Sequence, residues 1–506
     1  MASRWKLVLA AAWCLTAAGC DGQMWSSSVL THDSVLAKAG LANYWQLDLQ
    51  LPPGESIVKL ILIEENLYCL TASNCLLAVD AASGVRKWSH QVAEKGVTIF
   101  APCHGTKVPI DPNVSRVVPR DIGPWRGTGR NDPNLPGVVK ILAPLAPASL
   151  PAKDLVLINT PDYVLALDRM TGEEVRKISF AQYQPSSFVA NTGGGCDGTY
   201  FHVGTANGDV KSIRINEGVV AWSYQAGSIM SGDLKSVLSN EGNVNKTKTD
   251  KSLQTMESVA WSYRGWSIIS ASPQCLPVTG ASPRIYVATG EGDLAILKSG
   301  SLLSMLWPLT TRNWPPTKGW NEGNDMAGAV VAGFHVDDRA AFIPCLNKRV
   351  YAFGLAGGQP LWRFTTEGQL HDDIQVSENS VFQYSRGDKF YALDVSSGKS
   401  RWSMRQGRRV LAAMPSKGVP MAYLVDNARN LLVVDEILGK IQVTIPLTGV
   451  NLFADNTSAT ALYLGNTAGR LVCLRQIGAE HLTPDTLKKA KAEAKATTKA
   501  TTAPAK

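Results

Sequence analysis

The stretch DKFYALDVSSGKSRW, residues 388–402, decides the fold because versions of it recur along the chain. Residues 390–393 form a short apolar run rich in β-forming side chains, which is typical of a strand buried on both faces. Asp394 ends that strand by accepting backbone N–H groups of a turn, and Gly398 supplies a position with positive φ. Trp402 then lies on a return strand, where we expect its large side chain to pack against the next copy of the repeat.

Copies of this pattern predict a repeat architecture. The turn signature, an Asp followed four residues later by a Gly, occurs as Asp80 with Gly84, Asp168 with Gly172, Asp394 with Gly398, and Asp435 with Gly439. A Trp occupies the return-strand position at Trp45, Trp88, Trp222, Trp307, Trp362 and Trp402. In the C-terminal half, corresponding positions are separated by 40, 41 and 40 residues, at Gly354, Asp394, Asp435 and Arg475. A period near forty with about four short strands per unit indicates a β-propeller.

The two ends of the repeat region complement each other. The last copy, residues 461–475, stops before its return strand, whereas residues 41–49 (LANYWQLDL) form an isolated return strand with Trp45 in the Trp position. Donating this strand to the last blade would close the ring and remove exposed strand edges. We therefore predict an all-β chain with a single propeller of four-stranded blades, eight in number, closed by an N-terminal strand. Seven and nine blades are the alternatives.

The repeat resembles that of the pyrroloquinoline-quinone (PQQ) repeat β-propellers over roughly residues 41–478. That superfamily contains quinoprotein dehydrogenases and also non-catalytic members, such as the BamB-type lipoproteins of outer-membrane protein assembly. The resemblance is specific for the fold. It is much less specific for activity, because one propeller scaffold hosts unrelated functions.

The N-terminus carries an export signal. Residues 1–19 combine a basic start, a nine-residue apolar core and small residues, which is typical of a secretory signal peptide. The sequence LTAAGC also resembles a lipoprotein signal with Cys20 as the lipidated residue, although Ala17 stands where that motif usually has Leu. Residues 20–40 then form a tether. We predict a protein on the periplasmic side of the bacterial cell envelope, lipid-anchored to the inner or outer membrane; ordinary cleavage, leaving Cys20 as a thiol, is the alternative.

The charge distribution excludes a nucleic-acid groove. The formal net charge is +8, but the signal and the Lys/Ala/Thr-rich tail, residues 479–506, hold most of it and leave the body near neutral. A nucleic-acid-binding face needs clustered Lys and Arg. The tail itself has a low-complexity composition that predicts disorder.

Three insertions interrupt the propeller repeat, at residues 102–152, 228–257 and 308–326. Loops carry function more often than strands do, and Trp and Arg are over-represented at binding hot spots. The candidate partner-binding residues are therefore Trp125, Arg126, Arg130, Trp314 and Trp320. The alternative is that these Trp side chains fold back onto the blades.

No motif assigns a catalytic, cofactor-binding or metal-binding residue. The glycine-rich segments 193–198 and 290–295 lead into strand-like sequence rather than a helix, so they are interpreted as turns. We interpret the triplet at residues 371–373 (His-Asp-Asp) as a surface strand end rather than a metal site, because consecutive strand residues point to opposite faces. Cys69 and Cys75 flank a predicted hairpin and are either bridged or two free thiols.

The resemblance leaves two functions to weigh. A PQQ-dependent dehydrogenase needs a calcium ion and a carboxylate base, and its alcohol-oxidising members carry two adjacent cysteines; no residue here matches these parts. We therefore predict a non-catalytic, membrane-tethered scaffold without a cofactor, which binds envelope proteins through loops on one face. The scaffold is expected to be a monomer within a larger assembly, acting in envelope or outer-membrane protein assembly as BamB-type proteins do. A quinoprotein dehydrogenase with PQQ and Ca²⁺ is the alternative.

Overall fold

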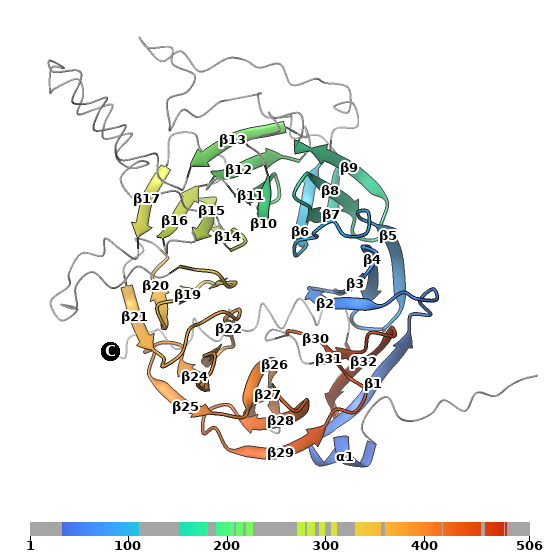
Figure 1. Cartoon of the computed structure of the whole chain (residues 1–506), viewed down its shortest axis with the longest axis vertical. Helices are drawn as coiled ribbons and strands as arrows, with labels where there is room; N and C mark the ends of the chain where they lie inside the picture. Colours follow the sequence, from blue (N-terminus) through green and yellow to red (C-terminus); the bar gives the residue numbers. More distant parts are fainter. Residues whose placement is uncertain are drawn as a thin grey trace, which may run out of the picture.

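The strands form a ring of small antiparallel sheets arranged around a common centre (Figure 1). The computed structural model describes residues 33–110, 151–180, 189–206, 209–215, 219–225, 271–278, 281–288, 293–298, 305–310, 329–355, 360–416, 418–456, 461–479 and 481–482. These residues contain eight four-stranded sheets and one short helix. The predicted all-β propeller with four-stranded blades is confirmed.

Seven sheets are continuous in sequence, and each runs from an inner strand to an outer one (Figure 1). The first three contain β2 (Ile57–Ile63), β3 (Asn66–Thr71), β4 (Cys75–Asp80) and β5 (Arg86–Gln91); β6 (Cys103–Pro109), β7 (Ala152–Asn159), β8 (Tyr163–Asp168) and β9 (Glu174–Ser179); and β10 (Ala190–Cys196), β11 (Tyr200–Thr205), β12 (Asp209–Arg214) and β13 (Val219–Gln225). The next two contain β14 (Gln274–Val278), β15 (Ala281–Ala288), β16 (Asp293–Lys298) and β17 (Met305–Thr310); and β18 (His335–Val336), β19 (Ala341–Cys345), β20 (Arg349–Phe353) and β21 (Pro360–Thr365). The last two contain β22 (Gln375–Val376), β23 (Ser380–Tyr384), β24 (Phe390–Asp394) and β25 (Ser400–Met404); and β26 (Gly407–Ser416), β27 (Val419–Asp426), β28 (Asn430–Asp435) and β29 (Ile441–Pro446).

The remaining sheet joins the two ends of the propeller. It consists of β30 (Leu452–Ala454), β31 (Leu462–Gly465), β32 (Arg470–Gln476) and, as its outer strand, β1 (Leu41–Asp48). In the antiparallel register Trp45 faces Cys473 and Leu47 faces Leu471. The helix α1 (Asp33–Lys38) precedes β1 and buries Leu36 in the adjoining core. Residues 481–482 return to the same sheet, where the Leu482 N–H donates to the Tyr44 hydroxyl at 3.0 Å.

A Trp from each of four sheets docks on the turn of the following sheet. The indole Nε1 of Trp88 donates to the carbonyl of Arg169 at 3.0 Å, one residue after the turn residue Asp168. The same contact recurs from Trp45 to Ala81 at 3.1 Å, from Trp362 to Val395 at 3.0 Å, and from Trp402 to Glu436 at 2.8 Å. Each Trp thus places a large apolar surface between sheets while its polar N–H finds a partner.

The turn glycines make room for these indoles. Gly398 has φ +67°, and a Cβ there would lie 2.4 Å from Cδ2 of Trp362. Gly84, Gly172 and Gly439 also have positive φ and face Trp45, Trp88 and Trp402 in the same way. Only a residue without a side chain meets both the backbone and the packing requirement.

The turn aspartates hold the backbone in position. Oδ1 of Asp394 accepts the N–H groups of Ser396 and Ser397 at 3.2 and 2.8 Å, and its other oxygen pairs with Arg401. The corresponding oxygens of Asp80, Asp168 and Asp435 accept two turn N–H groups each. Partial burial raises the pKa of Asp80, Asp168 and Asp394, but these hydrogen bonds and nearby cations outweigh it, so the pKa values lie below the ordinary value.

Three details differ from the sequence-based expectations. The segment 102–152 is not wholly an insertion, because strand β6 lies within its first residues; likewise β17 extends into the segment 308–326. Three of the glycines between 193 and 198 lie in the inner strand β10 rather than in a turn. Other segments of the chain approach these glycines closely, since a Cβ at position 195 would lie 2.6 Å from the Pro273 carbonyl. The remaining one, Gly198, has φ +94° and follows the strand.

The hairpin register explains the state of Cys69 and Cys75. Cys69 faces Leu77 across the β3–β4 pair, and Cys75 lies at the far end of β4 opposite Gln91 of β5. Both thiols are free.

We expect Gly398→Ala to destabilise the protein more than Gly387→Ala. Both positions have positive φ, which costs Ala about 1–2 kcal/mol. At Gly398 the methyl group also overlaps the Trp362 ring, adding about 1–3 kcal/mol, whereas nothing lies within 4 Å of the Cβ position at Gly387. Free energies of unfolding from urea titrations measure the difference. Equal losses at the two positions would show that the indole contact does not constrain the turn.

The turn aspartates predict a loss of stability in acid. Because their folded-state pKa values are lowered, their contribution is complete above the unfolded value of about 3.9 and is lost as the pH falls toward the folded pKa. We expect the urea midpoint to decrease below about pH 4. Asp394→Asn should lower the midpoint at pH 6 and make its acid dependence shallower. A variant profile parallel to that of the unchanged protein between pH 6 and pH 3 would contradict this account.

Candidate functional site

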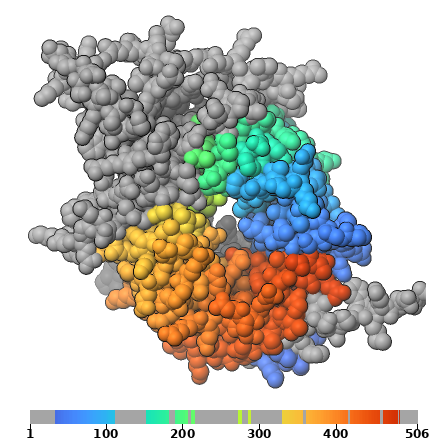
Figure 2. All heavy atoms as spheres, in the orientation of Figure 1, coloured from blue at the N-terminus to red at the C-terminus, as the bar shows by residue number. Residues whose placement is uncertain are grey.

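A pocket lined by charged side chains opens where four sheets meet around the centre of the ring. Its volume is about 530 Å³, and it is lined by the segment before β22, the beginning of β26, the β27–β28 turn, the end of β30, and Lys59 of β2. The space-filling view shows a hollow between the segments coloured blue, orange and red (Figure 2). Pockets with a few convergent polar groups beside aromatic side chains are the usual candidates for ligand or partner binding.

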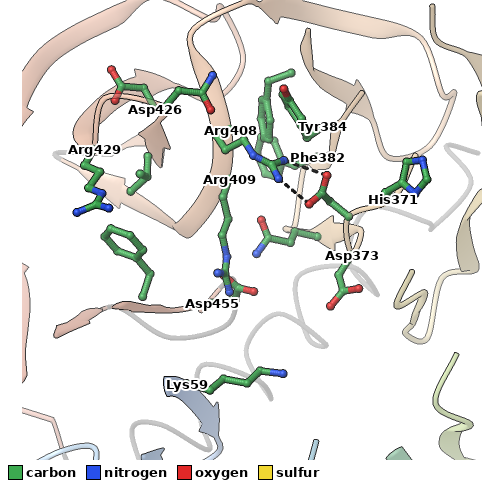
Figure 3. Close-up of a pocket in the computed structure, with 16 residues that line it drawn as sticks. Lys59, His371, Asp373, Phe382, Tyr384, Arg408, Arg409, Asp426, Arg429 and Asp455 are labelled. Atoms are coloured by element: carbon green, nitrogen blue, oxygen red, sulfur yellow. Dashed lines mark hydrogen bonds and ion pairs between the residues drawn. The ribbon is translucent and has the colours of Figure 1, made fainter. Parts of the chain in front are cut away.

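Arg408 is held in the pocket by an ion pair and by an aromatic ring. Its two terminal nitrogens donate to the two carboxylate oxygens of Asp372, both at 2.9 Å (Figure 3). The guanidinium also lies 4.1 Å from the centre of the Tyr384 ring. The hydrogen bonds to Asp372 raise the pKa of Arg408 above its usual value. This bidentate, stacked arrangement fixes one wall of the pocket.

A second group of charges lies beside this wall. Arg409 extends from β26 to an ion pair with Asp455, and Arg429 and Lys59 project from the neighbouring turn and from β2 (Figure 3). Arg429 has φ +62°, a conformation that residues with a Cβ rarely adopt. Among the described residues, neither Lys59 nor Arg429 forms an ion pair.

The triplet at residues 371–373 lines this pocket, but its side chains do not converge. Asp372 pairs with Arg408, as described above, whereas Asp373 accepts the Gly333 N–H at 2.6 Å and His371 lies 3.1 Å from the Gln369 side chain. Near His335, Asp337 pairs with Arg339 and lies 3.7 Å from the His335 ring nitrogen.

A buried charge cluster joins the first two continuous sheets. The guanidinium of Arg169 lies 3.0 Å from Glu64, 3.1 Å from Glu65 and 3.1 Å from Asp154. His104 lies 3.1 Å from Glu64 through Nδ1 and 2.8 Å from the Tyr68 hydroxyl through Nε2. Burial lowers the pKa of His104 and raises that of Tyr68, which keeps both side chains neutral near pH 7.

The ligand atoms of Glu64, Glu65 and His104 all lie within 4.8 Å of one another, which is compatible with a metal ion. In this structure Arg169 supplies the positive charge that balances the carboxylates. The cluster therefore links the β2–β5 sheet to the β6–β9 sheet. Sequence analysis missed it because its members come from the β2–β3 turn, β6, β7 and the turn after β8. The adjacent Glu64 and Glu65 were the only local signal.

Three cysteines lie on successive inner strands: Cys103 on β6, Cys196 on β10 and Cys275 on β14. Burial raises the pKa of all three, that of Cys196 to about 12. A thiol must lose its proton to act as a nucleophile, so these groups are poorly suited to that chemistry at neutral pH.

The residues predicted to bind a partner lie outside the described part of the chain, namely Trp125, Arg126, Arg130, Trp314 and Trp320; so does Cys20. The backbone places Trp222 and Trp307 in β13 and β17, the fourth strands of their sheets. Among the described residues, no helix has the length and apolar character needed to cross a membrane.

Comparison with known proteins gives a family match for the C-terminal part of the propeller. Residues 315–476, which include every pocket residue except Lys59, match the family model described as "Outer membrane protein assembly factor BamB". This part of the chain is similar to the PQQ-like propellers of the BamB type. A search of curated proteins gave no match.

Two solved structures are similar to the chain. The crystal structure of BamB from Moraxella catarrhalis has a TM-score of 0.49 and 13% sequence identity, covering 87% of this chain and 99% of that chain. The crystal structure of the computationally designed Ika8 protein has a TM-score of 0.47 and 10% identity, covering 85% and 98%.

We expect Arg169→Met to destabilise the propeller by about 3–5 kcal/mol, because it leaves the buried Glu65 carboxylate without a countercharge. Lys153→Met is the matched control. Its pair with Asp168 is 3.4 Å long and the lysine side chain is 45% exposed, so the loss should stay below about 1 kcal/mol. Urea unfolding of the two variants tests the contrast. Similar losses would show that the cluster adds nothing beyond a surface ion pair.

Proposed function

We propose that this protein is a non-catalytic scaffold of the bacterial cell envelope, which binds other envelope proteins on the face that carries the pocket. The match of residues 315–476 to the BamB family model carries the proposal, since those residues build most of the pocket. A role in outer-membrane protein assembly follows by analogy with that family's description.

The proposed scaffold is a closed ring of eight blades tethered to a membrane. The antiparallel pairing of β1 with β32 supports closure, and a closed ring has no open sheet edges. The signal-like residues 1–19 and the lipoprotein-like Cys20 support export and lipid anchoring on the periplasmic side. Rigid blades would then present loops to a partner without rearrangement, which lowers the entropy lost on binding.

Site-specific photo-crosslinking tests the scaffold function. A photoreactive residue replaces Asn427, an exposed pocket residue, in the full-length lipoprotein expressed in its own envelope. The control replaces Ser396, which is exposed in a turn at the opposite end of the strands, because successive turns of an antiparallel sheet alternate between the two ends. We expect a discrete crosslinked envelope protein from position 427 and none from position 396.

Two results would overturn the scaffold. One is the absence of any crosslinked protein at position 427. The other is saturable dye reduction by the purified protein with alcohols or sugars in the presence of PQQ and Ca²⁺, which would favour the dehydrogenase alternative.

A further inference from the structure

Four cations and four carboxylates line the pocket, and two of the cations form no ion pair with the described residues. Arg408 and Arg409 are paired with Asp372 and Asp455. Lys59 and Arg429 are exposed pocket residues and have no ion pair among the described residues. Two cations therefore remain available for a ligand.

The two other carboxylates of the pocket, Asp373 and Asp426, keep their negative charge, but they accept hydrogen bonds from N–H groups of the chain. Both oxygens of Asp426 accept from Asn430, one from its backbone N–H at 2.7 Å and one from its side-chain amide at 2.8 Å. Asp373 accepts the N–H of Gly333 at 2.6 Å. Because these acids point at donors of the chain itself, they are less available than Lys59 and Arg429 to a ligand.

The available cations come from separate sheets. Lys59 belongs to β2 near the N-terminus, whereas Arg429 belongs to the β27–β28 turn, and the close-up shows Arg409 and Asp455 in the region between them (Figure 3). The partly buried ring of Phe453 lines the same pocket and adds an apolar contact. A ligand that meets two cations from different sheets and an aromatic ring needs several groups along an extended backbone.

We propose that this pocket binds an acidic, extended segment of a partner protein, whose carboxylates pair with Lys59 and Arg429 and whose apolar side chain packs on Phe453. The inference rests on the proposed scaffold function and adds the chemistry of the partner. A volume of about 530 Å³ accommodates a few side chains of such a segment. Exposed charge pairs of this kind accelerate association and make binding sensitive to salt.

Two synthetic peptides test the charge preference with the purified full-length protein. The probe has the sequence Glu-Gly-Glu-Phe-Glu-Gly-Glu, and its counterpart carries Lys in place of each Glu; both are labelled with fluorescein and followed by fluorescence anisotropy. We expect the acidic peptide to bind at least about tenfold more tightly than the basic one, and to weaken as salt is added. No binding of the acidic peptide, or tighter binding of the basic one, would overturn the inference.

Charge reversal locates the binding. The double variant Lys59→Glu with Arg429→Glu should weaken acidic-peptide binding at least about tenfold. The control, Lys399→Glu with Lys440→Glu, makes the same change in net charge at two exposed turn residues on the opposite face, and should change the affinity less than about twofold. Equal losses of peptide affinity in the two double variants would show that only the net charge of the protein matters, and would contradict a binding site in the pocket. Complete displacement of the peptide by an equal concentration of inorganic phosphate would instead assign the pocket to small anions.

The crosslinking experiment separates this inference from the scaffold function. An undiminished amount of the crosslinked protein from position 427 in the Lys59→Glu, Arg429→Glu variant would support the scaffold function and contradict the binding of an acidic segment in the pocket. If the unchanged lipoprotein gives no crosslinked protein, the scaffold itself fails, whatever the peptides do.

Discussion

The hydrogen bond from a Trp indole to the carbonyl that follows a turn aspartate is the contact on which the ring depends. A four-stranded sheet of about twenty residues has too little apolar surface to be stable alone. The indole solves this by burying its ring against the next sheet while its N–H meets a fixed acceptor at 2.8–3.1 Å in the four described cases. Position and angle of each sheet are thereby set by its neighbour.

The three parts of that contact constrain one another. The aspartate orients the turn through its N–H groups, the turn directs the carbonyl, and the glycine leaves space for the ring. One of the four docking sites carries an additional contact. At Arg169, the residue whose carbonyl accepts from Trp88 also extends its side chain into the carboxylates of Glu64, Glu65 and Asp154. One residue therefore joins two sheets through its backbone and its side chain together.

The sequence could predict the fold because its determinants are local. Asp394, Gly398 and Trp402 lie within nine residues, and their spacing encodes strand, turn and docking contact together. The candidate pocket could not be predicted, since Lys59 and Arg429 meet only after the ring has formed. The same applies to Glu64 and Arg169, which come from turns of two neighbouring sheets. The glycines at 193–195 were misassigned because a turn and a crowded strand both favour glycine. The sequence alone does not show that the segment at Pro273 lies against these residues.

The sheet that contains β1 and β32 is assembled from both ends of the chain, and Tyr44 contacts His481 across 437 residues. A polypeptide is synthesised from its amino end, so β1 is complete long before its partner strand exists. Throughout that interval its backbone donors and acceptors stay open to wrong pairings, and loop closure over such a length is entropically costly. The last sheet of the ring therefore cannot form until nearly the whole chain has been made.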